Sequence, residues 1–333
     1  MTPLLSFLIL FSLISLSNAQ PIIQGPAYGS ISGGAIVSTG QLERMVEYFP
    51  PHAKIVNPLW DKYNPPLADN KFNTTPPAAP PGSNEIIDPA VSSSPLILDP
   101  PGVVIDFEGI PDRGTTIPPD PHLAVGPNHV IAVVNSEFVI FDKQGNQLFQ
   151  AFADDWFQNV LPNADAFDPV IIYDHFEGRW VMVWDNVGAN TAYWLVSVSD
   201  DSDPMGNWCN FAFPAHLNGS TNTSTWGDYE KVGYDYQAIY ITGRQFLFNG
   251  GFQYCKLRII PKSQLYAGNC GPVDYTDFWD FRDPNNPVQR VDGPPIAAVH
   301  LDSTDNKAYL VVDSPYFTST FITLWTVEDP LGA

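Results

Sequence analysis

Three aspartates recur at comparable places along the chain, and their side chains could hold a cation. Asp120, Asp168 and Asp228 each stand just before an apolar run, at spacings of 48 and 60 residues. If these runs are the inner strands of repeated sheets, the carboxyls meet at one mouth of a central channel, with Asp174 and Asp185 nearby. Converging carboxylates repel one another unless a cation lies among them, and Ca²⁺ takes six to eight oxygen ligands. The pattern predicts a calcium site at the three aspartates, unless each caps its own strand.

The same region holds the candidates for acid and base catalysis. Glycosidic bonds are cleaved by two carboxyl groups about 5 to 10 Å apart. Glu230, beside Asp228, is the best acid candidate among the few glutamates. The sequence has no G-x-S-x-G motif for a nucleophilic serine. His122 and His129 flank a Gly-Pro-Asn turn and are interpreted as loop histidines. A catalytic role therefore depends on Asp228 and Glu230.

Aromatic side chains offer a second kind of site, because an exposed ring can stack on a sugar. Most tryptophans are expected in the core. Trp226, next to a Ser/Thr/Asn-rich loop, and Trp279, among aspartates, are the two that could lie exposed on loops.

The composition predicts that β-strands position these residues. The 36 acidic residues comprise 28 Asp and only 8 Glu, and they accompany 33 Pro and 24 Gly, which favours turns over helices. Short β-branched and aromatic runs alternate with turn residues. The predicted strands are 103–107, 130–134, 138–141, 170–173, 180–184, 193–198, 238–242, 257–260, 308–312 and 321–327. Helical turns are expected only at 155–160 and 261–266.

The strands fall into about four groups of similar length. Asp142-Lys143-Gln144-Gly145-Asn146 precedes the last strand of the first group, and Asp203-Pro204-Met205-Gly206-Asn207 precedes that of the second. Groups of about 45 to 65 residues with up to four strands are typical of β-propeller blades. We therefore expect an all-β fold, a β-propeller with about four recognisable blades, with a β-sandwich as the alternative. The last group, 294–328, has three strands, so either 103–109 closes the ring or the chain is part of a larger propeller.

Several motifs also resemble those of a known family. They are PPDPHLAVGPNHV at 118–130, FVIFDKQG at 138–145, DPVIIYD at 168–174 with RWV at 179–181, and DYEKVG at 228–233. Together they resemble a family of secreted, mostly bacterial proteins of unassigned function with propeller-like repeats. The resemblance covers roughly residues 105–330 and implies a fold and secretion, but no catalytic residues. Family members tend to be longer, which favours a fragment.

The N-terminal third predicts export. Residues 1–19 combine an apolar run with a Ser-Asn-Ala end and are interpreted as a signal peptide, with an uncleaved anchor as the alternative. Residues 20–102 are Pro-rich and read as an arm or linker, with a short helix expected at 40–49. Residues 103–333 would form the domain. Export gives meaning to three N-x-Ser/Thr sites, at Asn73, Asn218 and Asn222.

Three cysteines in an oxidising compartment predict one disulfide and one unpaired thiol. The pairing among Cys209, Cys255 and Cys270 cannot be deduced from the sequence.

The charge balance excludes some partners and favours others. A net charge of -21 disfavours nucleic acid and anionic membranes, which both need a basic surface. The main hypothesis is a secreted acidic propeller that acts as an extracellular binding or scaffold protein, with calcium as its cofactor and a glycan or protein as its ligand. The alternative is a carbohydrate-active enzyme, a hydrolase or lyase that uses the channel-mouth carboxylates. A further alternative is an acidic matrix or mineral-associated protein. The sequence leaves the question of enzymatic activity open and leans against it.

Overall fold

The computed structural model describes residues 23–46, 55–56, 105–112, 116–313 and 322–332. The predicted signal peptide, Asn73 and most of the Pro-rich arm lie outside these residues. No helix within the described ranges is long and apolar enough to cross a bilayer.

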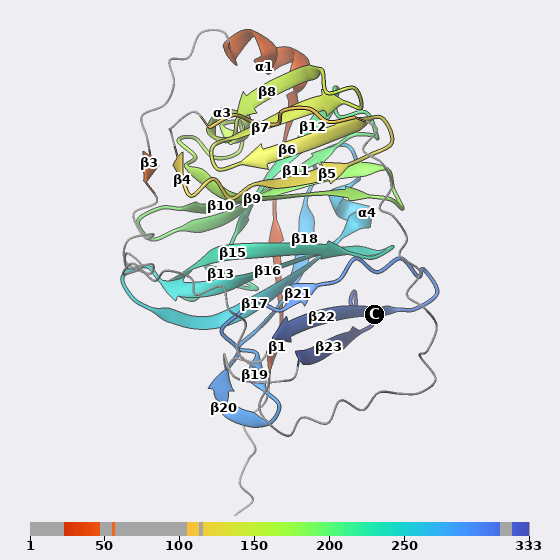
Figure 1. Ribbon diagram of the computed structural model, residues 1–333. Coiled ribbons are helices and arrows are strands. Elements are labelled where there is room, and N and C mark those ends of the chain that lie inside the picture. The colour runs from red at the N-terminus through yellow and green to blue at the C-terminus, as the bar shows by residue number, and fades with distance from the viewer. Residues whose placement is uncertain (1–22, 47–54, 57–104, 113–115, 314–321, 333) are drawn as a thin grey trace, which may run out of the picture.

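Most of the described strands belong to four antiparallel sheets, which lie one on another (Figure 1). The first consists of β5 (His122–Val125), β6 (His129–Val134), β7 (Glu137–Asp142) and β8 (Gln147–Phe152). The second consists of β9 (Ala166–Asp174), β10 (Arg179–Val187), β11 (Ala192–Ser199) and β12 (Asn207–Pro214). The third consists of β15 (Thr225–Tyr234), β16 (Ala238–Leu247), β17 (Phe252–Pro261) and β18 (Val273–Trp279). The fourth consists of β21 (Ile296–Ala297), β22 (Lys307–Asp313) and β23 (Ile322–Glu328).

The first strand of each sheet contacts the first strand of the next. Within a sheet, hydrogen-bonded neighbours follow chain order because consecutive strands form hairpins. Between sheets, β5 lies against β9, β9 against β15, and β15 against β21. Side chains from these strands are therefore brought together although they are far apart in sequence. This arrangement positions the site described below.

The all-β class is confirmed, whereas a closed ring is not seen. In the described part of the chain the four sheets remain separate and do not join into a closed barrel or ring. The predicted strand at 103–107 is wrong where it is described, since 105–107 form no strand. Phe107 instead packs on Phe141, with ring centroids 5.4 Å apart.

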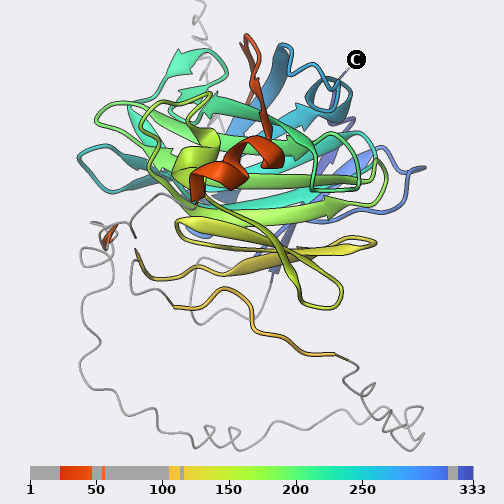
Figure 2. The ribbon, with the colours of Figure 1, turned by 90° about the horizontal axis from the view of Figure 1, so that it is seen from above.

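Part of the Pro-rich arm adds strands to two sheets. β1 (Gln24–Ile31) pairs with β18, and β2 (Ala35–Ser38) pairs with β12, so each of these sheets has five strands. The expected short helix is present as α1 (Thr39–Val46), next to β8 at one end of the stack (Figures 1 and 2). The remaining elements are β3 (Ile55–Val56), β4 (Thr116–Ile117), α3 (Ala153–Phe157), β13 (Leu217–Asn218), β14 (Thr221–Asn222), α4 (Lys262–Leu265), β19 (Arg282–Asp283) and β20 (Asn286–Arg290).

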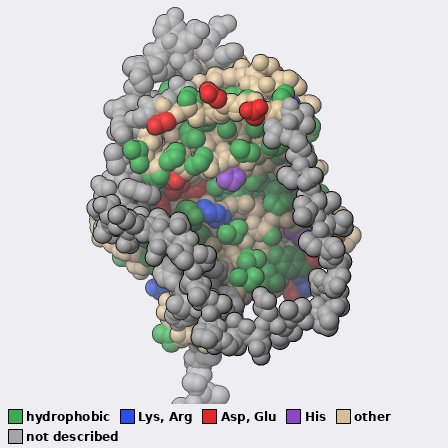
Figure 3. Space-filling view, in the orientation of Figure 1, with side chains coloured by type: hydrophobic (Ala, Val, Ile, Leu, Met, Phe, Trp, Pro, Cys, Tyr) green, Lys and Arg blue, Asp and Glu red, His purple; other side chains and the backbone are tan. Residues whose placement is uncertain are grey.

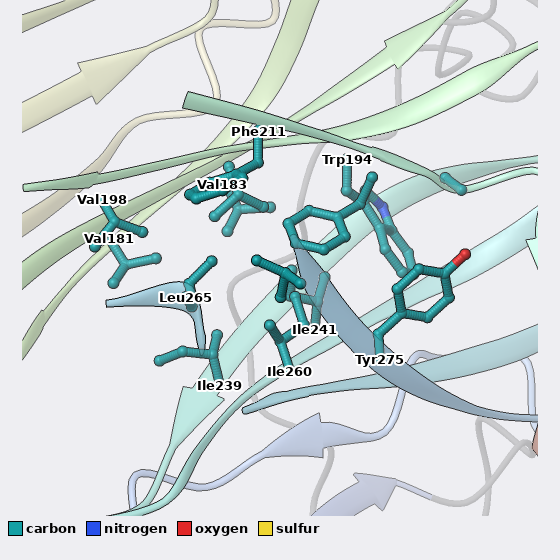
Figure 4. Packing of buried hydrophobic residues seen from close by; sticks show 14 of the residues in the cluster. Val181, Val183, Trp194, Val198, Phe211, Ile239, Ile241, Ile260, Leu265 and Tyr275 are labelled. Carbon is teal, nitrogen blue, oxygen red and sulfur yellow. The ribbon is translucent and has the colours of Figure 1, made fainter. Parts of the chain in front are cut away.

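The main core lies between the second and third sheets (Figure 4). Val183, Trp194 and Phe211 from the second sheet face Ile241 and Tyr275 from the third. These strands are apolar on both faces because each inner sheet is covered on both sides. The packing fixes the spacing between β9 and β15, on which the site depends.

One disulfide, between Cys209 on β12 and Cys270 before β18, links the second sheet to the third. Cys255 is free and buried on β17. The predicted combination of one disulfide and one free thiol is confirmed, and the structure supplies the pairing.

Candidate functional site: a buried carboxyl cluster

Carboxyl groups from neighbouring sheets converge where β9, β10 and β15 meet. One oxygen from each of Asp168, Asp185 and Asp228 lies within 4.8 Å of the others. Asp120, just before β5, joins them through Asn135. The Asn135 amide donates to Asp120 at 2.5 Å, while its oxygen accepts the backbone N–H of Asp168 at 2.6 Å.

Irregular backbone sets the direction of these side chains. Asp120 has a φ of 41° and Asp168 a φ of 49°, in the left-handed region that residues other than glycine rarely adopt. The pairing of β9 with β10 shifts register between Val183 and Asp185, and that of β15 with β16 shifts between Asp228 and Lys231. Bulges of this kind re-aim side chains and are common beside functional sites. Left-handed residues of this type cost on the order of 1 kcal/mol or more each, and such strain clusters at functional sites.

Two members of the cluster are buried without donors. Asp185 and Glu230 are each 1% exposed, and no described Lys, Arg, Asn, Gln or hydroxyl side chain donates a hydrogen bond to their carboxyl oxygens. The two carboxyls interact directly with one another. Two ionised carboxylates cannot share a dry site at low cost, so a proton between them is the simplest way to neutralise the pair.

The carboxyl groups have different proton affinities. Burial, and then the negative charges of Glu230, Asp228 and Asp120, raise the pKa of Asp168 to about 9. Burial raises the pKa of Asp228 only to about 6, because the positive charge of Arg244 opposes it. At neutral pH, Asp168 therefore carries a proton and Asp228 does not.

The two innermost acids also hold protons more tightly than usual. Burial raises the pKa of Glu230 to about 7, opposed by its hydrogen bond with Asp185. Burial and the charge of Glu230 raise the pKa of Asp185 well above its ordinary value. Separated pKa values within one cluster are a common feature of catalytic acids and bases.

Two cations border the cluster. Arg244 on β16 lies opposite Asp228 in the strand register, and its Nη2 also binds Asp292 at 2.7 Å. Lys231 donates from Nζ to the Glu230 carbonyl at 2.9 Å. The cluster has more carboxyl groups than these two cations can neutralise, so it carries excess negative charge when its carboxyls are ionised.

Exposed residues follow Asp120 and Asp228 in the chain. His122 and Leu123 on β5 and Tyr229 on β15 are all exposed. In the orientation of Figure 1, the molecule presents acidic, basic and histidine side chains near one another among hydrophobic ones (Figure 3). Burial and the positive charge of Lys231 lower the pKa of His122, so its ring is neutral at pH 7.

The sequence-predicted residues are brought together in part. Asp168, Asp228 and Glu230 lie in the cluster, and Asp120 borders it. Asp185, expected only nearby, is one of its central members. Asp174 lies apart at the far end of β9, where Lys262 binds it at 2.5 Å. The calcium site stays a prediction, and the geometry would replace Asp120 with Asp185 as third member.

The aromatic candidates differ from expectation. Trp226 is 3% exposed and stacks on Phe246, with centroids 5.4 Å apart, so it belongs to the core. Trp279 is half-buried at the end of β18. The exposed ring nearest to the cluster residues in the chain is Tyr229, which the strand pattern did not predict. Its place between Asp228 and Glu230 in the sequence could have indicated it.

The two described glycosylation sites differ in accessibility. Asn218 is 5% exposed, and its amide nitrogen, the atom that a glycan would occupy, donates to the Tyr254 hydroxyl at 3.1 Å. This geometry disfavours a glycan there. Asn222 is exposed and accepts the Ser224 N–H through its side-chain oxygen at 2.9 Å, which leaves its nitrogen accessible.

Comparisons with known proteins give the following. No protein-family model matches the chain, and no curated protein shows significant similarity. Solved structures with partial likeness include an arabinanase of Bacillus subtilis, at 12% identity over 58% of this chain and 64% of that one, with a TM-score of 0.31. A xylan beta-1,4-xylosidase of Bacillus halodurans matches at 13% identity over 58% and 36%, with a TM-score of 0.34. An alpha-L-arabinofuranosidase of Podospora anserina matches at 16% identity over 64% and 65%, with a TM-score of 0.32.

These findings correct the main functional hypothesis. The solved structures named above are all carbohydrate-cleaving enzymes by their titles, so the comparisons contradict the main hypothesis of a binding or scaffold protein. The chain spans 64% and 36% of the first two. Because the TM-scores lie between 0.31 and 0.34, the likeness carries no argument about activity or substrate, and the site geometry must supply both. The family resemblance found in the motifs gains no support from a sequence match, and only its all-β character is shown.

Proposed function

We propose that the chain is a carbohydrate-active enzyme that hydrolyses glycosidic bonds at the buried carboxyl cluster. The observation that carries this proposal is that Asp168 and Asp228 have carboxyl oxygens within 4.8 Å of each other. Hydrolysis of a glycoside needs two carboxyls that play opposite roles, one protonated and one ionised.

Asp168 is assigned as the acid. Its pKa of about 9 keeps it protonated at neutral pH, and the side chain is only partly buried, so its proton can reach a glycosidic oxygen. Protonation of the leaving oxygen by a positioned acid is worth about 10²- to 10⁴-fold in rate.

Asp228 is assigned as the base or nucleophile. Its pKa of about 6 leaves it ionised at neutral pH, and Arg244 supports the negative charge. Its partly exposed position also leaves it accessible. The buried acids Asp185 and Glu230 are assigned a positioning role. Asp185 lies beside Asp168 and Asp228, and the negative charge of Glu230 helps to keep the proton affinity of Asp168 high.

The proposal includes the wider fold and the compartment. The chain-ordered sheets, with first strands in contact, support a propeller arrangement in which the cluster lies at the inner strands. The N-terminal sequence pattern supports secretion, which would place the enzyme where extracellular glycans are available.

The experiment is an assay of reducing-end release from a panel of neutral and acidic polysaccharides. We expect the wild-type chain to release reducing ends from at least one of them. Asp168→Asn and Asp228→Asn should each lose at least about 10²-fold in kcat/KM. Asp274→Asn, which alters an exposed carboxylate on β18, is the matched control and should retain full activity. A wild-type chain without activity on the panel, or an active Asp228→Asn, would overturn the proposal.

A further inference from the structure

Tyr229 has an unusual position beside the carboxyl cluster. It lies between Asp228 and Glu230, inside the bulge where β15 shifts register against β16. Its φ is 57°, in the left-handed region, where a bulky side chain is a clear outlier. Its ring is 54% exposed, whereas Glu230 next to it is 1% exposed. The backbone therefore holds an aromatic ring at the surface at a conformational cost.

The ring is held on one side and free elsewhere. Lys231 Nζ lies 3.4 Å from the Tyr229 ring centroid, and the same nitrogen is fixed by the Glu230 carbonyl at 2.9 Å. Among the described residues no other ring contacts Tyr229. A cation over a ring orients it at little cost in stability. The exposed surface of the ring is thus presented to solvent, one residue along the chain from Asp228.

The charge of the surroundings selects among ligands. The cluster combines Asp120, Asp168, Asp185, Asp228 and Glu230 with two nearby cations, and the chain has a net charge of -21. An anionic glycan would meet repulsion there, whereas a neutral sugar would not. A neutral sugar also has an apolar C–H face that packs on an aromatic ring, with hydroxyls left for polar groups at the edge.

We propose that Tyr229 is the platform on which a neutral sugar ring packs beside the bond to be cleaved. This inference deepens the proposed hydrolase function and rests on it for the cleavage step. Binding of the sugar to Tyr229 does not require cleavage. His122 on β5 is also exposed, and it lies near enough to Lys231 for the charge of that lysine to act on it. The substrate class is therefore a neutral glycan rather than a polyuronate.

The test separates binding from cleavage. Affinity is measured by calorimetry in the Asp228→Asn background, which prevents turnover, with neutral xylo-, arabino- and cello-oligosaccharides and with oligogalacturonate as the anionic probe. We expect at least one neutral series to bind and oligogalacturonate not to bind. Tyr229→Ala should weaken the neutral ligand about tenfold, a loss equivalent to about 1.4 kcal/mol, and Tyr229→Phe should retain most of the affinity.

Two controls keep the result interpretable. Tyr28→Ala removes a ring that is 70% exposed on β1, at the outer edge of the third sheet, and should leave affinity unchanged. Tyr229→Gly removes the same ring and relieves the positive φ, so it should lose affinity while its melting temperature stays equal or rises.

The outcomes for the two proposals differ. Neutral-sugar binding that depends on Tyr229, without hydrolysis by the wild-type chain, would leave the platform standing and overturn the hydrolase. Hydrolysis with unchanged affinity and KM in Tyr229→Ala would overturn the platform alone. Binding of oligogalacturonate in preference to neutral sugars would overturn the inferred substrate class.

Discussion

Asp168 and Asp228 lie on adjacent first strands, β9 and β15, and their carboxyl oxygens approach within 4.8 Å although 60 residues separate them in the chain. The contact exists because each sheet begins with the strand that faces the next sheet. Their pKa values of about 9 and about 6 differ because Asp168 is surrounded by other carboxyls, whereas Asp228 has Arg244 beside it. The account of function depends on this pair.

The first prediction concerns the pH dependence of the reaction. Asp228 must be ionised and Asp168 protonated, so kcat/KM should rise as pH passes about 6 and fall as it passes about 9. The measurement is a pH profile of kcat/KM on the best polysaccharide. A profile with its maximum below pH 5 would contradict the assignment, because Asp228 would then be protonated at the optimum.

The second prediction concerns Arg244. Its charge lowers the pKa of Asp228, so Arg244→Met should move the acidic limb of the same profile to higher pH and leave the basic limb in place. Arg290→Met is the matched control, since Arg290 is paired with Asp280 at 2.7 Å and is not among the charges that shift Asp228. An acidic limb that does not move in Arg244→Met would show that a group other than Asp228 controls it.

The third prediction concerns stability. An aspartate titrates near pH 4 in an unfolded chain, but burial raises the pKa of Asp168 to about 9 in the folded state. The folded state therefore holds a proton that the unfolded state releases, and stability is lost as pH rises from about 4 to about 9. Asp185 acts in the same direction, because its pKa is also raised.

Asp185→Asn removes one of these costs. At pH 8 the variant should be more stable than wild type by on the order of 1 kcal/mol, or about 2 to 4 °C in melting temperature, and the gain should shrink at pH 5. Thermal melts at the two pH values provide the measurement. A variant less stable than wild type at pH 8 would mean that Asp185 is ionised and paired in the native state.

The fourth prediction concerns the disulfide. Cys209 and Cys270 are 61 residues apart, and closing a loop of that length in the unfolded chain is worth about 4 kcal/mol. Cys209→Ser with Cys270→Ser should lower the free energy of unfolding by about that amount in urea, with hydrolysis retained at low temperature. Cys255→Ser changes the free, buried thiol and is the comparison. Equal stability of the double variant and wild type would argue against this pairing.

The fifth prediction separates protons from calcium in the cluster. If protons neutralise the carboxyls, melts in EDTA and in millimolar Ca²⁺ should agree. A rise of about 5 to 10 °C with Ca²⁺, abolished by Asp168→Asn, would support the calcium site predicted from the sequence and contradict Asp168 as a protonated acid.

Much of the fold could be predicted, because the strongest strands are buried on both faces and read as continuous apolar runs. The runs at 180–184 and 193–198 fall within β10 and β11, for example. Strands β5 and β15 were missed because neither is a continuous apolar run. β5 includes a histidine, and β15 includes charged residues and glycines. β1 and β2 were missed because pairing with distant β18 and β12 leaves no local pattern.

The sequence could identify several members of the site, but not the direction in which each side chain points. Asp120, Asp168 and Asp228 were identified by their repeated place before an apolar run, although Asp168 and Asp228 lie within β9 and β15 and not before them. The sequence could not show that Asp185 on the second strand of its sheet turns inward at a bulge. It also could not show that Trp226 is buried while Tyr229, three residues later, is held at the surface by a positive φ.

Hydrolysis at the Asp168 and Asp228 pair is tested most directly by reducing-end release at pH 7, compared among wild type, Asp168→Asn and Asp228→Asn. We expect turnover by wild type and a loss of at least about 10²-fold in each variant, with Asp274→Asn unaffected. Equal turnover by all four chains, or none by wild type on any neutral or acidic polysaccharide of the panel, would contradict hydrolysis at this pair.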